Sequence, residues 1–209
     1  MVINTSFNDR IIRLLFAIML FLVAFFWVSG VLEFLFYFVG VVLLITSFTG
    51  ICRVYRLLGI STCKIEKSPV RIKKSKKYLI VILLLVLIIL GSYFSIIFTN
   101  KIFLSDFEKF NSAYRQTLIY TEKNDKNNAV DYYGVFKLNF NSFKDKYANY
   151  RPYSVRGDRQ FGYDIIKIKM VIGDVDKTIG SSNLTIAHEQ LKELDPILKD
   201  IIVRNDLSG

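Results

Sequence analysis

Histidine and cysteine are scarce in this chain. Its 209 residues include one histidine, His188, and two cysteines, Cys52 and Cys63. Covalent haem needs a Cys-x-x-Cys-His motif and di-iron bundles need repeated Glu-x-x-His pairs, and neither pattern occurs. A lone histidine beside an apolar stripe is more often packed than a ligand. We therefore expect no cofactor, with a metal contact through His188 and Glu189 as the minor alternative.

Catalytic sequence motifs are missing as well. The single histidine lacks the sequence context of a catalytic triad or a nucleophile elbow. Neither the phosphate-binding Gly-x-x-x-x-Gly-Lys-Ser/Thr loop nor the dinucleotide-binding Gly-x-Gly-x-x-Gly occurs. We predict a non-enzymatic protein, and a site built from carboxylates alone is the alternative that the sequence leaves open.

Basic residues are in excess, but only in one region. The net charge is +10, yet residues 99–209 hold 17 Lys/Arg against 15 Asp/Glu. In the first 98 residues, seven of the 11 basic residues lie between Lys64 and Lys77. A basic run beside an apolar segment and without interleaved aromatic residues is typical of membrane orientation. We therefore expect no nucleic-acid partner.

Three long apolar runs occupy the first 98 residues. Ile11–Ser29 and Val31–Thr49 have 19 residues each, and Tyr78–Phe98 contains no charged residue. A helix of 19 residues spans about 28 Å, the thickness of a bilayer core. Arg13 and Glu33 lie near run ends, where they can reach the interface. We predict three transmembrane helices in contact with the lipid bilayer, the first two forming a tight hairpin.

The loops predict how these helices are oriented. The first loop has no Lys or Arg, whereas residues 51–77 have nine. The positive-inside rule then places the N-terminus and this second loop in the cytoplasm, and residues 99–209 outside. Both cysteines would lie in the reducing compartment, so the exported part has no thiol.

The first 65 residues carry a sequence pattern with several elements in register. They contain Asn8-Asp-Arg-Ile-Ile-Arg13, two apolar helices, and then Gly50-Ile-Cys-Arg-Val-Tyr-Arg-Leu-Leu-Gly-Ile-Ser-Thr-Cys-Lys64. Residues 3–65 thereby resemble the YgaP-like transmembrane domain, a helical hairpin of the bacterial inner membrane. Arg53 stands where the family usually has proline, and the rhodanese domain fused to some members is absent. The resemblance implies an inner-membrane location and a hairpin that often forms a homodimer, but no sulfur-transfer activity.

This pattern and the apolar runs together predict four parts. We expect a YgaP-like hairpin with a cytoplasmic cysteine loop at residues 1–65 and a basic cytoplasmic linker at residues 66–77. A third transmembrane helix follows at residues 78–98, and residues 99–209 form a periplasmic helical domain. The chain is thus predicted to be a multi-pass membrane protein.

Cys52 and Cys63 form the candidate thiol site. No second cysteine pair or nearby histidine completes a zinc site within one chain. A homodimer would bring four thiolates together, and Arg53, Arg56 and Lys64 would lower their pKa. Two interpretations stay open, and we favour cysteines packed for structure over thiol or sulfur sensing.

Residues 103–205 contain four segments with apolar residues at three- and four-residue steps. The stripes run over residues 103–118, 133–150, 161–179 and 184–201. Residues 166–170 also alternate with period two, but the longer helical match favours a helix there. Connections are expected at residues 121–128, 151–157 and 180–183, and Pro196 should kink the last helix near Lys192. The predicted fold is therefore all-α, with a soluble antiparallel four-helix bundle after the membrane helices.

Tyrosine and arginine residues gather around the second of these segments. The candidate partner surface comprises Tyr132, Tyr150, Arg151, Tyr153, Arg156 and Arg159. These residue types dominate interface hot spots, although an aromatic core with a solvated rim is the plainer alternative. We predict that the periplasmic domain binds an unidentified partner or small ligand. The alternative function is a redox or sulfur-responsive protein acting through Cys52 and Cys63, and a transporter is disfavoured because the spans lack an ionisable pathway.

Overall fold

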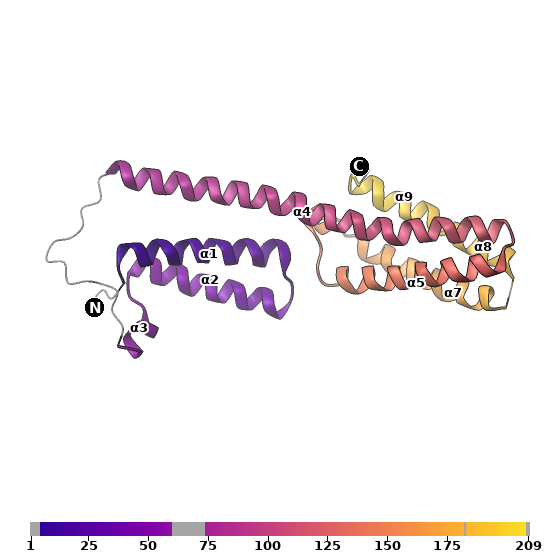
Figure 1. The fold of residues 1–209 in the computed structure, drawn as a ribbon, viewed down its shortest axis with the longest axis horizontal. Coiled ribbons are helices and arrows are strands. Elements are labelled where there is room, and N and C mark those ends of the chain that lie inside the picture. Colours follow the sequence, from indigo (N-terminus) through magenta and orange to yellow (C-terminus); the bar gives the residue numbers. More distant parts are fainter. Residues whose placement is uncertain (1–4, 60–73, 182, 208–209) are drawn as a thin grey trace. The chain divides into compact units, whose positions relative to one another are not determined.

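The protein is all-helical over the residues that the structure describes. The computed structural model describes residues 5–59, 74–181 and 183–207, and within these ranges it contains nine helices and no strand (Figure 1). The chain divides into two compact units, Met1–Ser95 (unit 1) and Ile96–Gly209 (unit 2). The predicted all-α class is confirmed.

Unit 1 begins with a helical hairpin. It comprises α1 (Phe7–Trp27), α2 (Val31–Thr49) and the short α3 (Arg53–Leu57). Two glycines delimit α2: Gly30 precedes it with φ +72°, and Gly50 ends it with φ +68°. Side chains other than glycine rarely adopt such angles, so the bounds of α2 follow directly from the sequence.

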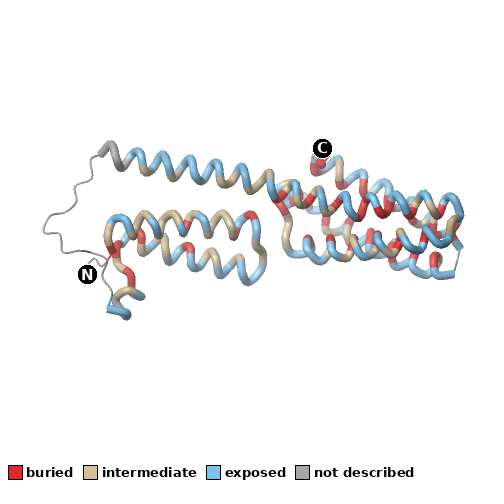
Figure 2. The backbone as a smooth tube through the Cα atoms, viewed as in Figure 1, coloured by how far each residue is buried: buried red, intermediate tan, exposed pale blue. Residues whose placement is uncertain are grey.

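Three helices among the described residues are long and apolar enough to cross a membrane. They are α1, α2 and the part of α4 that starts at Tyr78. Most of their large apolar side chains are exposed, and in Figure 2 these helices are mainly pale blue for exposed and tan for half-buried residues. Such exposure is unfavourable in water but normal for side chains that face lipid.

The helix α4 (Lys74–Glu122) differs from the prediction. The sequence indicated a helix ending at Phe98 and another beginning near Phe103, but α4 continues through residues 99–102 without a break. That stretch contains neither glycine nor proline, and Thr99 Oγ1 donates to the Ile96 carbonyl 3.2 Å away inside the helix. The change from apolar to mixed composition therefore alters the surroundings of the helix without ending it.

Unit 2 surrounds a single apolar core. After α4 come α5 (Lys126–Tyr147), α6 (Tyr153–Arg156), α7 (Phe161–Gly180), α8 (Leu184–Lys192) and α9 (Leu194–Arg204). The apolar stripes predicted for the four segments line the core, and the few members that are only partly buried pack against it. The helix expected over residues 166–170, in preference to a strand, is confirmed within α7.

Aromatic contacts define the course of α4 and α5. Ring centroids lie 4.9 Å apart for Phe103–Tyr147, 5.9 Å for Phe110–Phe140 and 5.7 Å for Tyr114–Phe136. Later residues of α4 meet earlier residues of α5, so the two helices run antiparallel.

The last amphipathic segment is two helices and not one kinked helix. Helices α8 and α9 are separated at Glu193, the residue after the predicted kink site Lys192. Pro196 lies in the first turn of α9, where its missing N–H costs no hydrogen bond within that helix. The connection expected at residues 151–157 likewise contains a helix, α6.

Candidate functional site

The Cys52 thiol lies between α2 and α3, against the first turns of α1. It is buried, and Arg13 Nη1 donates to its sulfur over 3.4 Å. The same guanidinium pairs with Asp9 at 3.1 Å and lies 4.6 Å from the centre of the Tyr55 ring. Arg13 therefore does not simply extend to the interface, as the sequence suggested, but joins α1 to the thiol.

The sequence at the end of α2 makes this approach of α1 possible. A Cβ at Gly50 would lie 1.8 Å from Arg10 Nη2, so only glycine leaves space for that side chain. Ser47 Oγ donates to the Arg10 carbonyl over 2.7 Å. A larger residue at position 50 would be strained at φ +68° and would displace the Arg10 guanidinium from this position.

The surroundings of Cys52 favour the thiolate. Burial opposes ionisation, but backbone hydrogen bonds from Tyr55 and Val54 and the Arg13 guanidinium outweigh it, so the pKa of Cys52 lies below its ordinary value. An apolar hollow of about 550 Å³ opens beside it, lined by these residues and by one face of α2. The site is thus a buried thiol with a lowered pKa and an apolar hollow beside it.

Only part of the predicted thiol site can be located. Cys63, Lys64 and the side chain of Arg56 lie outside the described residues, and Arg53 is exposed. The basic group that contacts Cys52 is Arg13, which sequence reasoning did not connect with it. One sequence signal could have connected them, because Arg13 and Cys52 both belong to the pattern of the first 65 residues.

A second candidate site is a groove between α5 and α7 in unit 2. Its volume is about 370 Å³, and its lining residues are Lys144, Tyr147, Ala148, Arg151, Phe161, Gly162, Ile165, Ile166 and Lys169. Every charged residue in this lining is basic, while the other side chains are apolar or aromatic. Such a groove suits an anionic ligand with an apolar part.

Arg151 is held at this groove by local contacts. Its Nη1 donates to the Asp158 carbonyl over 3.2 Å, and its guanidinium lies 5.7 Å from the centre of the Phe161 ring. A Cβ at Gly162 would lie 3.0 Å from Arg151 Nη2. Glycine at the start of α7 therefore lets the guanidinium lie close against the helix.

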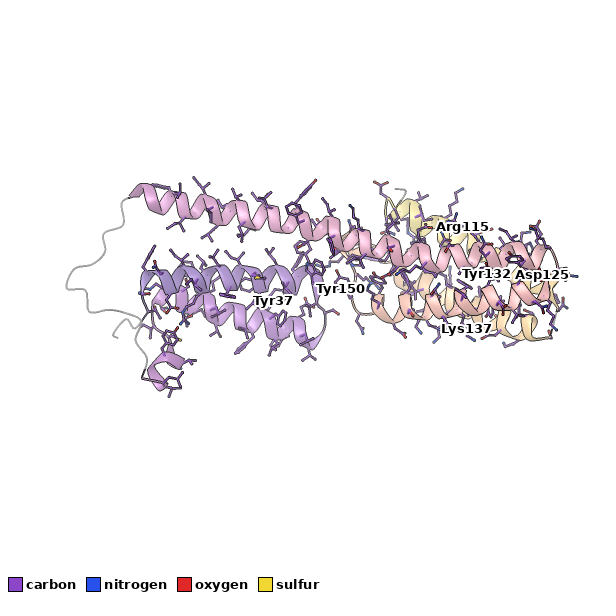
Figure 3. The ribbon with its side chains drawn as sticks, in the orientation of Figure 1. Tyr37, Arg115, Asp125, Tyr132, Lys137 and Tyr150 are labelled. Atoms are coloured by element: carbon purple, nitrogen blue, oxygen red, sulfur yellow. The ribbon has the colours of Figure 1, made fainter. Side chains whose placement is uncertain are left out.

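The structure places the predicted partner surface mostly at one end of unit 2. Tyr132 stacks on Tyr120 near the α4–α5 turn, with ring centroids 5.1 Å apart, and it lies at the opposite end from Tyr150 (Figure 3). Arg151 lines the groove, and the exposed residues of the set follow in and after α6, namely Tyr153, Arg156 and Arg159. The structure thus separates Tyr132 from the other five residues of the set.

A polar cluster closes the same end of unit 2. Asp158 accepts backbone N–H groups from Gln160 at 2.9 Å and Phe161 at 3.2 Å, and the Asn205 amide at 2.9 Å. Arg204 pairs with both Asp158 and the buried Asp164. Burial opposes ionisation of Asp158, but these donors outweigh it and hold its pKa below the ordinary range. Sequence reasoning missed this cluster, whose members are far apart in the chain.

His188 has a packing role in the structure. Its Nδ1 lies 3.1 Å from Thr121 Oγ1, which joins α8 to the end of α4. Within the part of the chain that the structure describes, no group of three His, Cys, Asp or Glu side chains gathers to hold a metal ion.

Comparison with known families identifies the N-terminal part. Residues 1–66 match the family model of the inner membrane protein YgaP-like transmembrane domain, so the resemblance predicted for residues 3–65 is confirmed. The match covers less than half of the chain and leaves unit 2 unassigned. No curated protein and no solved structure matches the chain. With its three candidate spans, the chain is a membrane protein that contacts the lipid bilayer and whose hairpin is similar to that of an inner-membrane family.

Proposed function

We propose that the chain is a non-enzymatic protein of the bacterial inner membrane whose exported domain binds a partner or small ligand. In this proposal the hairpin and the apolar part of α4 form the anchor. The cytoplasm holds the N-terminus and the basic loop, and the periplasm holds unit 2, arranged as an antiparallel four-helix bundle with α8 and α9 as its fourth member. The observation that carries the binding role is the groove between α5 and α7, with its three basic residues.

The charge distribution and the exposed surface support this proposal. The nine Lys and Arg of residues 51–77 favour a cytoplasmic location for that loop. Ile166, which lines the groove, is an exposed large apolar residue, and Met170 is exposed one turn further along α7. An apolar surface beside basic residues is typical of a binding site. The absence of catalytic motifs supports a binding role over an enzymatic one.

One labelling experiment tests both the export and the binding. Single cysteines at Ile166, Val203 and Val54 are introduced into a Cys52→Ser, Cys63→Ser background, since all three positions are exposed. A membrane-impermeant maleimide should label Ile166→Cys and Val203→Cys from outside in spheroplasts, and Val54→Cys only in inverted vesicles. The labelling rate of each cysteine is divided by its rate in the unfolded protein. This normalised rate should be several-fold lower for Ile166→Cys than for Val203→Cys, because a ligand covers the groove.

The outcomes separate the two parts of the proposal. Labelling of Val203→Cys only in inverted vesicles would reverse the orientation and exclude a periplasmic unit 2. Equal normalised rates at Ile166→Cys and Val203→Cys, both in membranes and after purification, would show an unoccupied groove and contradict the binding role.

The Cys52 contacts support a second candidate, a redox or sulfur-responsive protein. A thiolate hydrogen-bonded to Arg13 at 3.4 Å reacts faster with electrophiles at neutral pH than an ordinary thiol does. Cys63 lies outside the described residues, so the structural support for this candidate comes from Cys52 alone.

The reactivity of Cys52 should depend on Arg13. In full-length Cys63→Ser protein in nanodiscs, we expect Arg13→Gln to raise the pH midpoint of Cys52 alkylation by iodoacetamide. The reason is that the pKa of Cys52 is lowered in part by that guanidinium. The matched control is Arg53→Gln, which removes an exposed charge next to Cys52 in sequence. Identical pH profiles for Arg13→Gln and its parent protein would count against a sensing thiol.

Two further expectations are part of the proposal and stay predictions. The homodimer implied by the resemblance would form through the hairpin, where α2 buries only Gly40 and Ser47 among its own residues. The absence of enzymatic activity rests on the sequence motifs alone.

A further inference from the structure

We infer that the groove between α5 and α7 binds the headgroup of an anionic phospholipid, which names the ligand class for the site that the proposed function rests on. Three observations carry this inference. They are the charge of the groove, its apolar floor and its position along the chain.

The charge of the groove is unopposed. Lys144, Arg151 and Lys169 line it, and no acidic residue does. Lys144 contacts Asp145, whose side chain is 75% exposed, and such exposed pairs contribute little. Within the described ranges, no carboxylate lies within ion-pairing distance of Arg151 or Lys169. The groove therefore offers charge to an anion at the cost of one exposed ion pair, that of Lys144 with Asp145.

The floor of the groove is apolar. Tyr147 and Phe161 are buried in the aromatic core, and Ile165 and Ile166 complete the side formed by α7. Arg151 lies over Phe161 and presents a planar donor edge beside this floor. Guanidinium groups match phosphate oxygens geometrically, while an apolar floor suits the glycerol backbone and the first acyl carbons. A free inorganic anion would use only the first of these features.

The position of the groove favours a lipid over a soluble molecule. The ring of Phe103 packs on Tyr147 at 4.9 Å and on Phe161 at 5.9 Å, so the groove lies at the level of Phe103 on α4. Phe103 follows the end of the third apolar run, Phe98, by five residues, about 8 Å along a helix. The headgroup layer of a bilayer is about 5–8 Å deep on each side. The Phe161 end of the groove is therefore at the outer limit of the layer where phosphates lie, and the groove extends from there along α7 to Lys169.

Neighbouring residues are of the kind found at a lipid interface. Tyr153 and Tyr163 are 54% and 65% exposed, and Arg156 and Arg159 are exposed at the same end of unit 2. Tyrosine is enriched where membrane meets water, and basic residues are attracted to anionic lipid. Five members of the predicted Tyr and Arg surface thus lie at the same end of unit 2 as Phe161, and Arg151 among them lines the groove.

The test uses the full chain in nanodiscs and the labelling rate of Ile166→Cys, in the background without Cys52 and Cys63. Discs of phosphatidylcholine alone are compared with discs containing phosphatidylglycerol, and with phosphatidylcholine discs plus inorganic phosphate. Phosphatidylglycerol should slow maleimide labelling by about fivefold, the factor expected for one basic group at an anionic surface. Val203→Cys should keep the same rate in all three conditions.

Two double lysine variants distinguish binding in the groove from a general effect of the protein's positive charge. Lys144→Gln with Lys169→Gln should abolish the slowing, because both residues line the groove. Lys123→Gln with Lys177→Gln removes the same charge at exposed positions near the α4–α5 and α7–α8 turns and should leave the slowing intact. Far-UV circular dichroism confirms that each variant is folded.

The outcomes also separate this inference from the proposed function. Equal labelling with and without phosphatidylglycerol, combined with slow labelling of Ile166→Cys in cells, would overturn the lipid and leave a different ligand in the groove. Slowing by inorganic phosphate alone would assign the groove to a soluble anion. If phosphatidylglycerol still slows the labelling of Ile166→Cys in the Lys144→Gln, Lys169→Gln variant, the membrane covers the cysteine and no lipid is bound in the groove. That result would also overturn the inference.

Discussion

Replacing Phe143 by alanine should reduce the free energy of unfolding of unit 2 by about 3–5 kcal/mol. The Phe143 side chain is 2% exposed and is the most connected ring of the core. Its centroid lies 4.7–6.3 Å from those of Phe103, Phe107, Phe110, Tyr147 and Phe161. Alanine would leave a cavity where α4, α5 and α7 meet, and rings in a close-packed core relax only partly into such space.

The measurement is a denaturant titration of the full chain in detergent micelles, followed by the near-ultraviolet circular dichroism of its tyrosines. Leu138→Ala is the matched control, because Leu138 is on the same helix but 69% exposed. Its effect should stay within about 0.5 kcal/mol. A similar midpoint for both variants would show that the aromatic cluster does not form the cooperative core of unit 2.

Replacing Asp158 by alanine should cost about 2–4 kcal/mol, because hydrogen bonds to a charged group and helix caps each contribute about 1–3 kcal/mol. The variant loses the N–H acceptor for the start of α7 and a partner of both Asn205 and Arg204. Asp174→Ala is the control, since the side chain of Asp174 is 60% exposed and pairs with the exposed Lys177 in the next turn. Equal losses in the two variants would contradict a structural role for the cluster.

The pH dependence of the Asp158 contribution has a definite sign. Its pKa is lower in the folded protein than the unfolded value of about 3.9. The contribution is therefore complete above about pH 5 and is lost as the pH falls through the folded pKa. Between pH 7 and pH 3 the stability of the parent protein should fall more steeply than that of Asp158→Asn, measured by the same titration. Parallel curves would show that the charge of Asp158 does not contribute.

Local sequence signals predicted much of this fold. Val31–Thr49 was predicted from its apolar run with the bounds of α2, and in the structure a glycine stands at each end of that helix. The helical stripes of unit 2 were predicted because burial on one face imposes a period that the sequence shows directly. The continuity of α4 was missed because residues 99–102 change in composition but contain no residue that stops a helix.

The candidate sites depended on contacts between distant residues and were predicted less well. Cys52 was singled out, but its partner Arg13 is 39 residues away and belongs to another helix. Arg151 was included in the predicted partner surface. Lys144 and Lys169 were not predicted as site residues, because nothing in the sequence distinguishes them from other lysines on amphipathic helices. The Asp158 cluster joins residues separated by 40 to 47 positions, and no spacing rule connects them.

The contact between Arg204 and Asp158 also determines where additions to the protein can be tolerated. Arg204 is the last residue of α9 and lies at the end of unit 2 where the rings of Phe161 and Phe103 pack together. An affinity tag or fluorescent protein attached after α9 would therefore start at the same end of unit 2 as Phe161, which lines the basic groove. The turn at Asn124, where the backbone has φ +55° between α4 and α5, lies at the other end, near Tyr132. An epitope inserted in that turn would report on the protein while leaving the groove unobstructed.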